Sequence, residues 1–213
     1  MSPQPRRRAP AMTQQDRRDA IVQAALPLLA EHGAAVTTRQ IATAAGIAEG
    51  TVFRAFGDKD ELLRACIQEA MRSDQLRTRI HEVAPDSDTS TRLAEAALLI
   101  NDHFAHLGQL MRALVTTGYD VHRTHGRADE PDPADVRARF IAELSAALAD
   151  LLRPEAADLR VPVDELARML LPALVSVRLD EPEADPLPII RTRIDVLFHG
   201  ALRAQPHPGG THA

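Results

Sequence analysis

Apolar residues recur along the chain at intervals of three and four, which is the spacing of one face of an α-helix. Between about Gln14 and His32 this face is formed by Ile21, Ala25, Leu28 and Leu29, and Gly33 follows where a helix can end. Alternating β-branched runs are missing, and aromatic residues make up only 3% of the chain. The pattern therefore predicts an all-α fold.

Two short helices are predicted to follow the first. Thr37 is a suitable N-cap for a helix over about Thr38–Ala45, and Gly46 ends that helix. A short turn leads to another helix over Glu49–Phe56. Three short helices joined by a glycine-containing turn are typical of a helix-turn-helix. The outer side of the third helix then faces solvent and fits the major groove of DNA, which is about 12 Å wide.

The rest of the chain is predicted to be helical as well. A capping-box sequence at Asp58–Glu61 starts a helix that runs through Met71. Further helices are expected over about 90–104, 108–117, 133–152, 163–179 and 186–203. The predicted organisation is a disordered basic arm (1–13), a helix-turn-helix domain (14–58), a helical effector-binding and dimerisation domain (59–203) and a frayed tail (204–213).

The stretch from Arg18 to Ala70 resembles the DNA-binding domain of the TetR/AcrR family of bacterial regulators. The resemblance is strongest over 37–63, TTRQIATAAGIAEGTVFRAFGDKDELL. It implies a homodimeric repressor that binds a palindromic operator through its N-terminal domain. The C-terminal domain would bind a small molecule, and this binding would release the operator.

Carried over by position, the resemblance implies a set of DNA-binding residues. They are Thr38, Arg39, Gly50, Thr51, Phe53, Arg54 and Lys59. Three positions depart from the family pattern, since Phe53 replaces a phosphate-binding tyrosine, Ala55 a histidine, and Ala48 a Ser/Thr cap. Glu49 has the chemistry to accept a bond from cytosine, but an acid in the first helical turn is favoured by the helix dipole, so we assign it a structural role.

Charge is divided unevenly between the two ends of the chain. The net charge over 213 residues is −5. Residues 1–80 contain twelve basic and nine acidic residues, which gives +3, whereas the remainder contains thirteen basic and twenty-one acidic residues, which gives −8. A basic first third on an acidic body agrees with DNA binding confined to the N-terminal domain. No apolar run is long enough for a membrane span or a signal peptide, so we expect a cytoplasmic protein without a membrane partner.

Two further sets of residues are predicted in the C-terminal domain. The resemblance implies dimerisation through the last two helices, whose apolar stripes are Leu166, Leu170, Ala173, Val177, Leu187, Ile190, Ile194, Leu197 and Ala201. On pattern alone these stripes fit the protomer's own core equally well. Residues that combine bulk with polarity are candidates for an effector pocket, although each also fits plain core: Cys66, Met71, His103, Phe104, Met111, Tyr119 and Phe140. Mostly apolar walls favour an apolar or aromatic effector.

Other function classes have less support in the sequence. Cys66 is the only cysteine and falls on an apolar helix face, which fits a packing role better than a nucleophile. Catalytic and phosphate-binding motifs are absent, so we expect no enzyme, no cofactor and no metal site. A helix-turn-helix protein that is tethered to DNA and acts through a protein partner stays open as an alternative.

Overall fold

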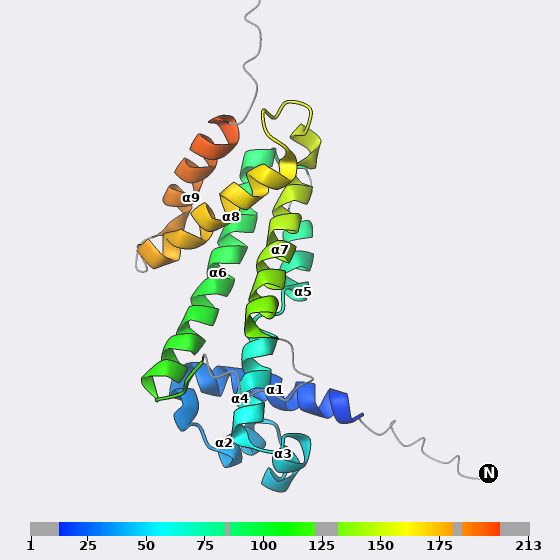
Figure 1. The fold of residues 1–213 in the computed structure, drawn as a ribbon, viewed down its shortest axis with the longest axis vertical. Coiled ribbons are helices and arrows are strands. Elements are labelled where there is room, and N and C mark those ends of the chain that lie inside the picture. The colour runs from blue at the N-terminus through cyan, green and yellow to red at the C-terminus, as the bar shows by residue number, and fades with distance from the viewer. Residues whose placement is uncertain (1–12, 84–85, 122–131, 181–184, 201–213) are drawn as a thin grey trace, which may run out of the picture. The chain divides into compact units, whose positions relative to one another are not determined.

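The computed structural model describes residues 13–83, 86–121, 132–180 and 185–200, and this part of the chain contains helices but no strand (Figure 1). The predicted all-α fold is confirmed. The predicted arm up to residue 12, the tail from 204 and the interface candidate Ala201 lie outside the described residues. The chain forms two compact units, one of residues 1–70 with 109–129 and one of 71–108 with 130–213.

The first unit, called the head below, contains the predicted three-helix arrangement. Its elements are α1 (Gln14–His32), a 3-10 turn (Gly33–Ala35), α2 (Thr38–Ala44), α3 (Glu49–Ala55), α4 (Lys59–Ala70) and the last residues of α6. Thr13 and Asp16 form a reciprocal capping box that starts α1, and Thr37 does the same for α2. The head therefore extends beyond the boundary expected at residue 58, because α4 and residues 109–129 belong to the same compact unit.

The helix α6 (Thr89–Thr116) is a correction to the sequence analysis, which expected two helices separated near residue 106. Gly108 lies inside this helix rather than at an end. One interior glycine costs only about 1 kcal/mol relative to alanine, and strong helix formers on both sides offset that cost. Two smaller corrections concern the preceding segment, since α4 ends at Ala70 and a separate helix, α5 (Asp74–His81), follows it.

The second unit, called the body below, contains α5, most of α6, α7 (Pro133–Leu152), α8 (Val163–Asp180) and α9 (Pro186–Ile194). A π-helical turn over Asp195–His199 continues α9. Helix α7 packs against α5 and α8, and α8 packs against α9 (Figure 1). The core between these helices is made almost entirely of leucine, alanine and isoleucine.

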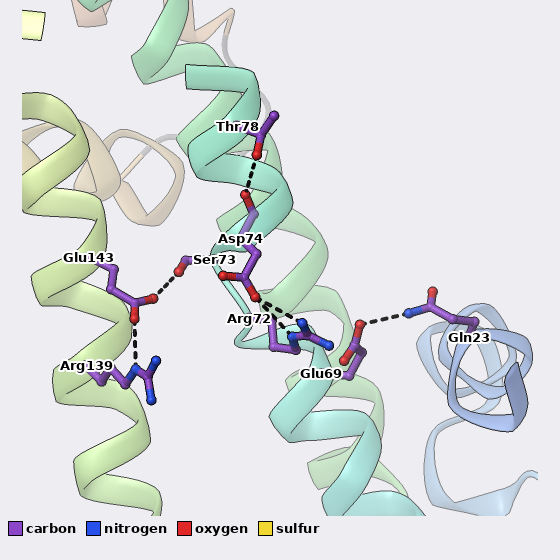
Figure 2. A network of polar contacts seen from close by, with 8 residues as sticks. All are labelled: Gln23, Glu69, Arg72, Ser73, Asp74, Thr78, Arg139 and Glu143. Atoms are coloured by element: carbon purple, nitrogen blue, oxygen red, sulfur yellow. Dashed lines mark hydrogen bonds and ion pairs between the residues drawn. The ribbon is translucent and has the colours of Figure 1, made fainter. Parts of the chain in front are cut away.

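A few polar contacts pin the helices of the body. Asn101 is buried on α6, and its side-chain amide donates to the carbonyl oxygens of Ala97 (2.8 Å) and Leu174 (2.9 Å). At the start of α5, the Ser73 hydroxyl donates to the Glu143 carboxylate, which also accepts from Arg139 at 2.8 Å (Figure 2). These contacts fix α6 against α8 and the start of α5 against α7.

Candidate nucleic-acid interface

The turn between α2 and α3 places the two helices around a small apolar core. Ile41 and Val52 are fully buried, one from each helix. Gly46 has a φ of +66°, a left-handed conformation that an L side chain rarely adopts, and this allows the sharp turn. The geometry is that of a helix-turn-helix, as the sequence predicted.

The outer face of α3 consists of Glu49, Gly50, Phe53 and Arg54, all of which are exposed, while Thr51 is half-buried. Ala55, where the family pattern has a histidine, would belong to the same outer side, but it is only 8% exposed. Ala55 stands three residues after Val52, so both residues lie on the side of α3 that faces the core. Small and polar side chains at the start of α3 leave its first turn open to a large partner.

Two of the predicted DNA-binding side chains make contacts along or between these helices. The Thr38 hydroxyl donates to the Glu49 carboxylate at 2.7 Å and thereby joins the start of α2 to the start of α3. Arg54 lies back along its own helix, where Nε donates to the Gly50 carbonyl at 3.2 Å. Its Nη2 is also 3.4 Å from the Thr51 hydroxyl. The bond from Thr38 agrees with the structural role assigned to Glu49.

Lys59 and Arg39 differ in their surroundings. The Lys59 ammonium donates to the carbonyl oxygen of Ala34 at 2.5 Å and so ties the start of α4 to the turn after α1. Arg39 is exposed on α2. In the described conformation Lys59 therefore stabilises the head, whereas the guanidinium of Arg39 is available to a phosphate.

Arg18 is an important residue of the head that the sequence analysis missed. Its guanidinium lies 4.1 Å from the centre of the Phe56 ring, donates to the Ala55 carbonyl and bonds Glu61 at 2.9 Å. Glu61 in turn accepts from the backbone N–H of Gly57 at 2.9 Å. One cation thus caps the C-terminus of α3 and connects it to α1 and α4. The only sequence signal for this role of Arg18 was that it stands at the start of the stretch that resembles the TetR/AcrR family.

The end of α6 is built into the same unit and holds the turn after α1. The Thr117 hydroxyl accepts a bond from the Ala34 backbone N–H at 2.7 Å. A Cβ added to Gly33, whose φ is +56°, would lie 2.1 Å from the Ala113 carbonyl oxygen. Only glycine allows this close approach of the two backbones. Ala34 is therefore held by Thr117 through its N–H and by Lys59 through its carbonyl.

The seven candidates for an effector pocket are divided between the two units. Cys66 belongs to the core of the head, with Tyr119 packed against it, and burial raises the pKa of the Cys66 thiol to about 12. Met111 is half-buried in the same unit. The other four belong to the body: Met71, His103, Phe104 and Phe140. The rings of His103 and Phe104 lie 5.4 and 5.6 Å from that of Phe140, so these three side chains form one aromatic cluster. Three of the seven pocket candidates, two from α6 and one from α7, thus lie together.

The body also contains a hollow that the sequence analysis did not predict. It measures about 430 Å³ and lies between α5 and α6. Its lining residues are Arg79, Glu82, Val83, Glu95, Leu98 and Leu99. Among the described residues, no group of three or more His, Cys, Asp or Glu side chains is placed to hold a metal ion.

The predicted dimer stripes require a correction. Five of the candidates are at most 2% exposed and belong to the body's own core: Leu166, Leu170, Val177, Ile190 and Ile194. Side chains that the protomer already buries are not available to a partner. Three others are half-buried: Ala173, Leu187 and Leu197. The large apolar side chains that α8 and the turn after α9 do expose are Met169 (50%) and Val196 (65%).

Comparison with known proteins agrees with this geometry. Residues 21–66 match the family model described as bacterial regulatory proteins of the tetR family. A protein of Mycobacterium tuberculosis (strain H37Rv) named as an HTH-type transcriptional repressor is 34% identical over 135 residues, which cover 61% of this chain. The head of this chain is therefore similar to the tetR family of bacterial regulatory proteins. The match spans 64% of the length of the mycobacterial protein.

Solved structures of transcriptional regulators share the fold over most of the chain. A transcriptional regulator of Rhodococcus sp. Rha1 superposes with a TM-score of 0.58 at 20% identity and covers 86% of this chain and 95% of its own. The TetR-family repressor FadR of Thermus thermophilus, solved in complex with lauroyl-CoA, has a TM-score of 0.55 at 22% identity. That match covers 91% of this chain and all of FadR. The predicted fold class, a helix-turn-helix domain followed by a helical domain, is confirmed.

Proposed function

We propose that the chain is a transcriptional repressor that binds a palindromic DNA operator as a homodimer and is released by a small molecule. The observation that carries this proposal is the outer face of α3, where Gly50, Phe53 and Arg54 are exposed beside a capped and bonded α2. The mycobacterial relative is named as a repressor, which supports the same function, and relatives named as regulators make an enzyme a poor alternative. Such a protein acts on the nucleoid, in the cytoplasm. No described helix is long and apolar enough to span a membrane.

DNA selection tests the proposal directly. We expect the full chain to enrich a palindrome from a random duplex pool at low salt, with half-sites about one helical turn apart. Arg54→Ala should alter the enriched bases, whereas Arg168→Ala, an exposed arginine of α8, should leave them unchanged. A pool from which no sequence is enriched would rule out the function.

Footprinting on the enriched site separates repression from tethering. A repressor protects a short palindrome that overlaps a promoter, whereas a tethered scaffold shows no preference for promoters. Arg39→Ala should weaken binding to all sequences by a similar factor and reduce the slope of log affinity against log salt by about one, because Arg39 is assigned a phosphate contact. A loss confined to particular base pairs would show that Arg39 contacts a base.

The effector is proposed to be apolar or aromatic and to bind in the body. The aromatic cluster His103–Phe104–Phe140 and the apolar walls around it support this assignment. Lauroyl-CoA bound to FadR of Thermus thermophilus supports an apolar ligand for this fold. A screen for compounds that release the selected DNA tests it, and Phe104→Ala should weaken release by the active compound while leaving DNA affinity unchanged.

Dimerisation is proposed to use the outward faces of α8 and of the turn after α9, where Met169 and Val196 are exposed. Replacing either by glutamate should shift the protein from dimer to monomer in sedimentation experiments. Ile141→Glu is the matched control, since Ile141 is 40% exposed on α7. An equal shift with this control would place the interface elsewhere.

A further inference from the structure

Phe53 exposes more apolar surface than the packing of α3 requires. The ring is 51% exposed, whereas Val52 and Phe56 on either side of it are each 1% exposed. Those two side chains already attach α3 to the core, and the guanidinium of Arg18 covers the Phe56 ring. Phe53 is therefore not needed to hold the helix, and its exposure is a surface property.

The ring can recognise only certain groups on a nucleic acid. It has no polar atom, so it cannot donate a hydrogen bond to a phosphate as a tyrosine can. The large apolar group in the major groove is the C5-methyl of thymine, which aromatic side chains contact. Gly50 stands one helical turn before Phe53, and a Cβ built there would meet nothing within 4 Å. The flank of the ring toward the start of α3 is therefore open to a base edge.

The charges around the ring favour a polyanion over a protein partner. Arg39 and Arg54 are exposed on the two helices of the motif, while the carboxylate of Glu49 is bonded to Thr38. An exposed apolar ring in a motif that also exposes two arginines suits a base pair that is flanked by phosphates.

We propose that Phe53 is a specificity-determining residue that selects thymine by contact between its ring and the C5-methyl group. The proposal rests on the operator binding proposed above, and it assigns one base of each half-site to one side chain. The ring replaces a phosphate anchor by a base contact. The protein thus loses affinity for the DNA backbone and gains discrimination between bases at one position.

Deoxyuridine substitution tests the contact, because uridine differs from thymidine at that base only by the missing methyl group. After the full chain has selected its site, each thymine is replaced in turn by deoxyuridine and affinity is measured by fluorescence anisotropy. We expect one position per half-site to lose affinity about fourfold, as expected for one buried methyl, and about fifteenfold when both half-sites are changed. Other thymines should tolerate the change.

Variants then link this position to the ring. Phe53→Ala should bind thymine and uracil equally at that position, and its melting temperature should stay within a degree or two of the wild type because the side chain is exposed. Val115→Ala, which removes an exposed apolar side chain of α6, should keep the fourfold difference. Phe53→Tyr should retain the methyl preference and leave the salt slope nearly unchanged, because its hydroxyl can donate a hydrogen bond to a phosphate but adds no positive charge.

The outcomes separate this inference from the proposed function. If no site is enriched, operator binding itself fails. If a site is enriched but no thymine is sensitive to removal of its methyl group, or if the sensitivity survives in Phe53→Ala, the assignment of Phe53 is overturned while operator binding stands. A ring that wedges between base pairs would lose affinity in Phe53→Ala without any difference between thymine and uracil, and this result would also overturn the proposal.

Discussion

The head and the body of this chain are stabilised in different ways. In the head, α2 and α3 have seven residues each, which is too short for a helix to be stable alone. Side chains that bond backbone groups stabilise this unit, namely Arg18 on Ala55 at the end of α3, and Lys59 and Thr117 on Ala34 in the turn after α1. In the body, helices of 18 to 28 residues bury a continuous leucine and alanine core.

In the head, some residues assigned to DNA binding also stabilise the fold. The residues that the family resemblance assigns to DNA include Thr38 and Lys59, both of which also make bonds inside the head. A substitution there changes the shape of the interface as well as its charge. The core of the body contains none of the residues that the resemblance assigns to DNA, so we expect a substitution there to change stability without changing base preference. Four substitutions test this comparison.

The largest effect is expected from Gly33→Ala in the head. The added Cβ would lie 2.1 Å from a backbone oxygen of α6, and the residue would also hold a φ of +56°. We expect the free energy of unfolding to fall by more than about 4 kcal/mol. Urea denaturation followed by circular dichroism measures the change.

Gly118→Ala is the control for this clash. Its φ is +83°, but a Cβ would meet nothing within 4 Å, so only backbone strain of about 1–2 kcal/mol is added. Equal losses in the two variants would show that the close approach between Gly33 and α6 does not stabilise the head.

Leu148→Ala tests the body. Leu148 is fully buried on α7, and the cavity should cost about 3 kcal/mol. Because Leu148 belongs to the body and the proposed DNA-contacting residues belong to the head, the selected DNA sequence should stay the same at temperatures where the protein is folded. Ile141→Ala, at an exposed position of the same helix, should cost less than about 1 kcal/mol. A change of base preference in Leu148→Ala would contradict the comparison.

Arg18→Ala should have an intermediate effect in the head, about 2 kcal/mol, since it leaves the Glu61 carboxylate and the Ala55 carbonyl without their cation. The side chain of Glu61 is 14% exposed, so water replaces the lost partner poorly. Arg17→Ala removes an exposed arginine one residue earlier and should leave stability unchanged. If the two variants are equally stable, the contacts of Arg18 contribute nothing to the fold.

The sequence predicted the head better than the body because the signals of the head are local. Thr37 with Gln40 and the turn at Gly46 are readable from neighbouring residues, and they set α2 and its end within one residue. The contact of Arg18 spans 37 positions to Ala55, and no local pattern records it. In the body, Leu166, Leu170 and Val177 recur at helical spacing, which predicts an apolar helix face. The spacing does not show whether that face packs against the protomer's own core or against a second subunit. In the structure these residues pack into the core of the body itself.

The smallest effect is expected from Glu143→Gln in the body, where an ion pair adds to an apolar core. The hydrogen bond from Ser73, and then that from Arg139, holds the pKa of Glu143 below its usual value of 4.5. The folded protein therefore binds this proton less readily than the unfolded chain, so the stabilisation is present above about pH 4.5 and is lost as the pH falls through the lowered pKa. Arg139 is 81% exposed, which limits the contribution of the pair to at most about 1 kcal/mol. Between pH 6 and pH 3 the free energy of unfolding of the wild type should thus fall slightly more than that of Glu143→Gln.

Glu165→Gln is the control, because Glu165 is an exposed acid on α8. Its free energy of unfolding should change with pH as that of the wild type does. Parallel curves for wild type and Glu143→Gln would show that the body depends on its apolar core alone.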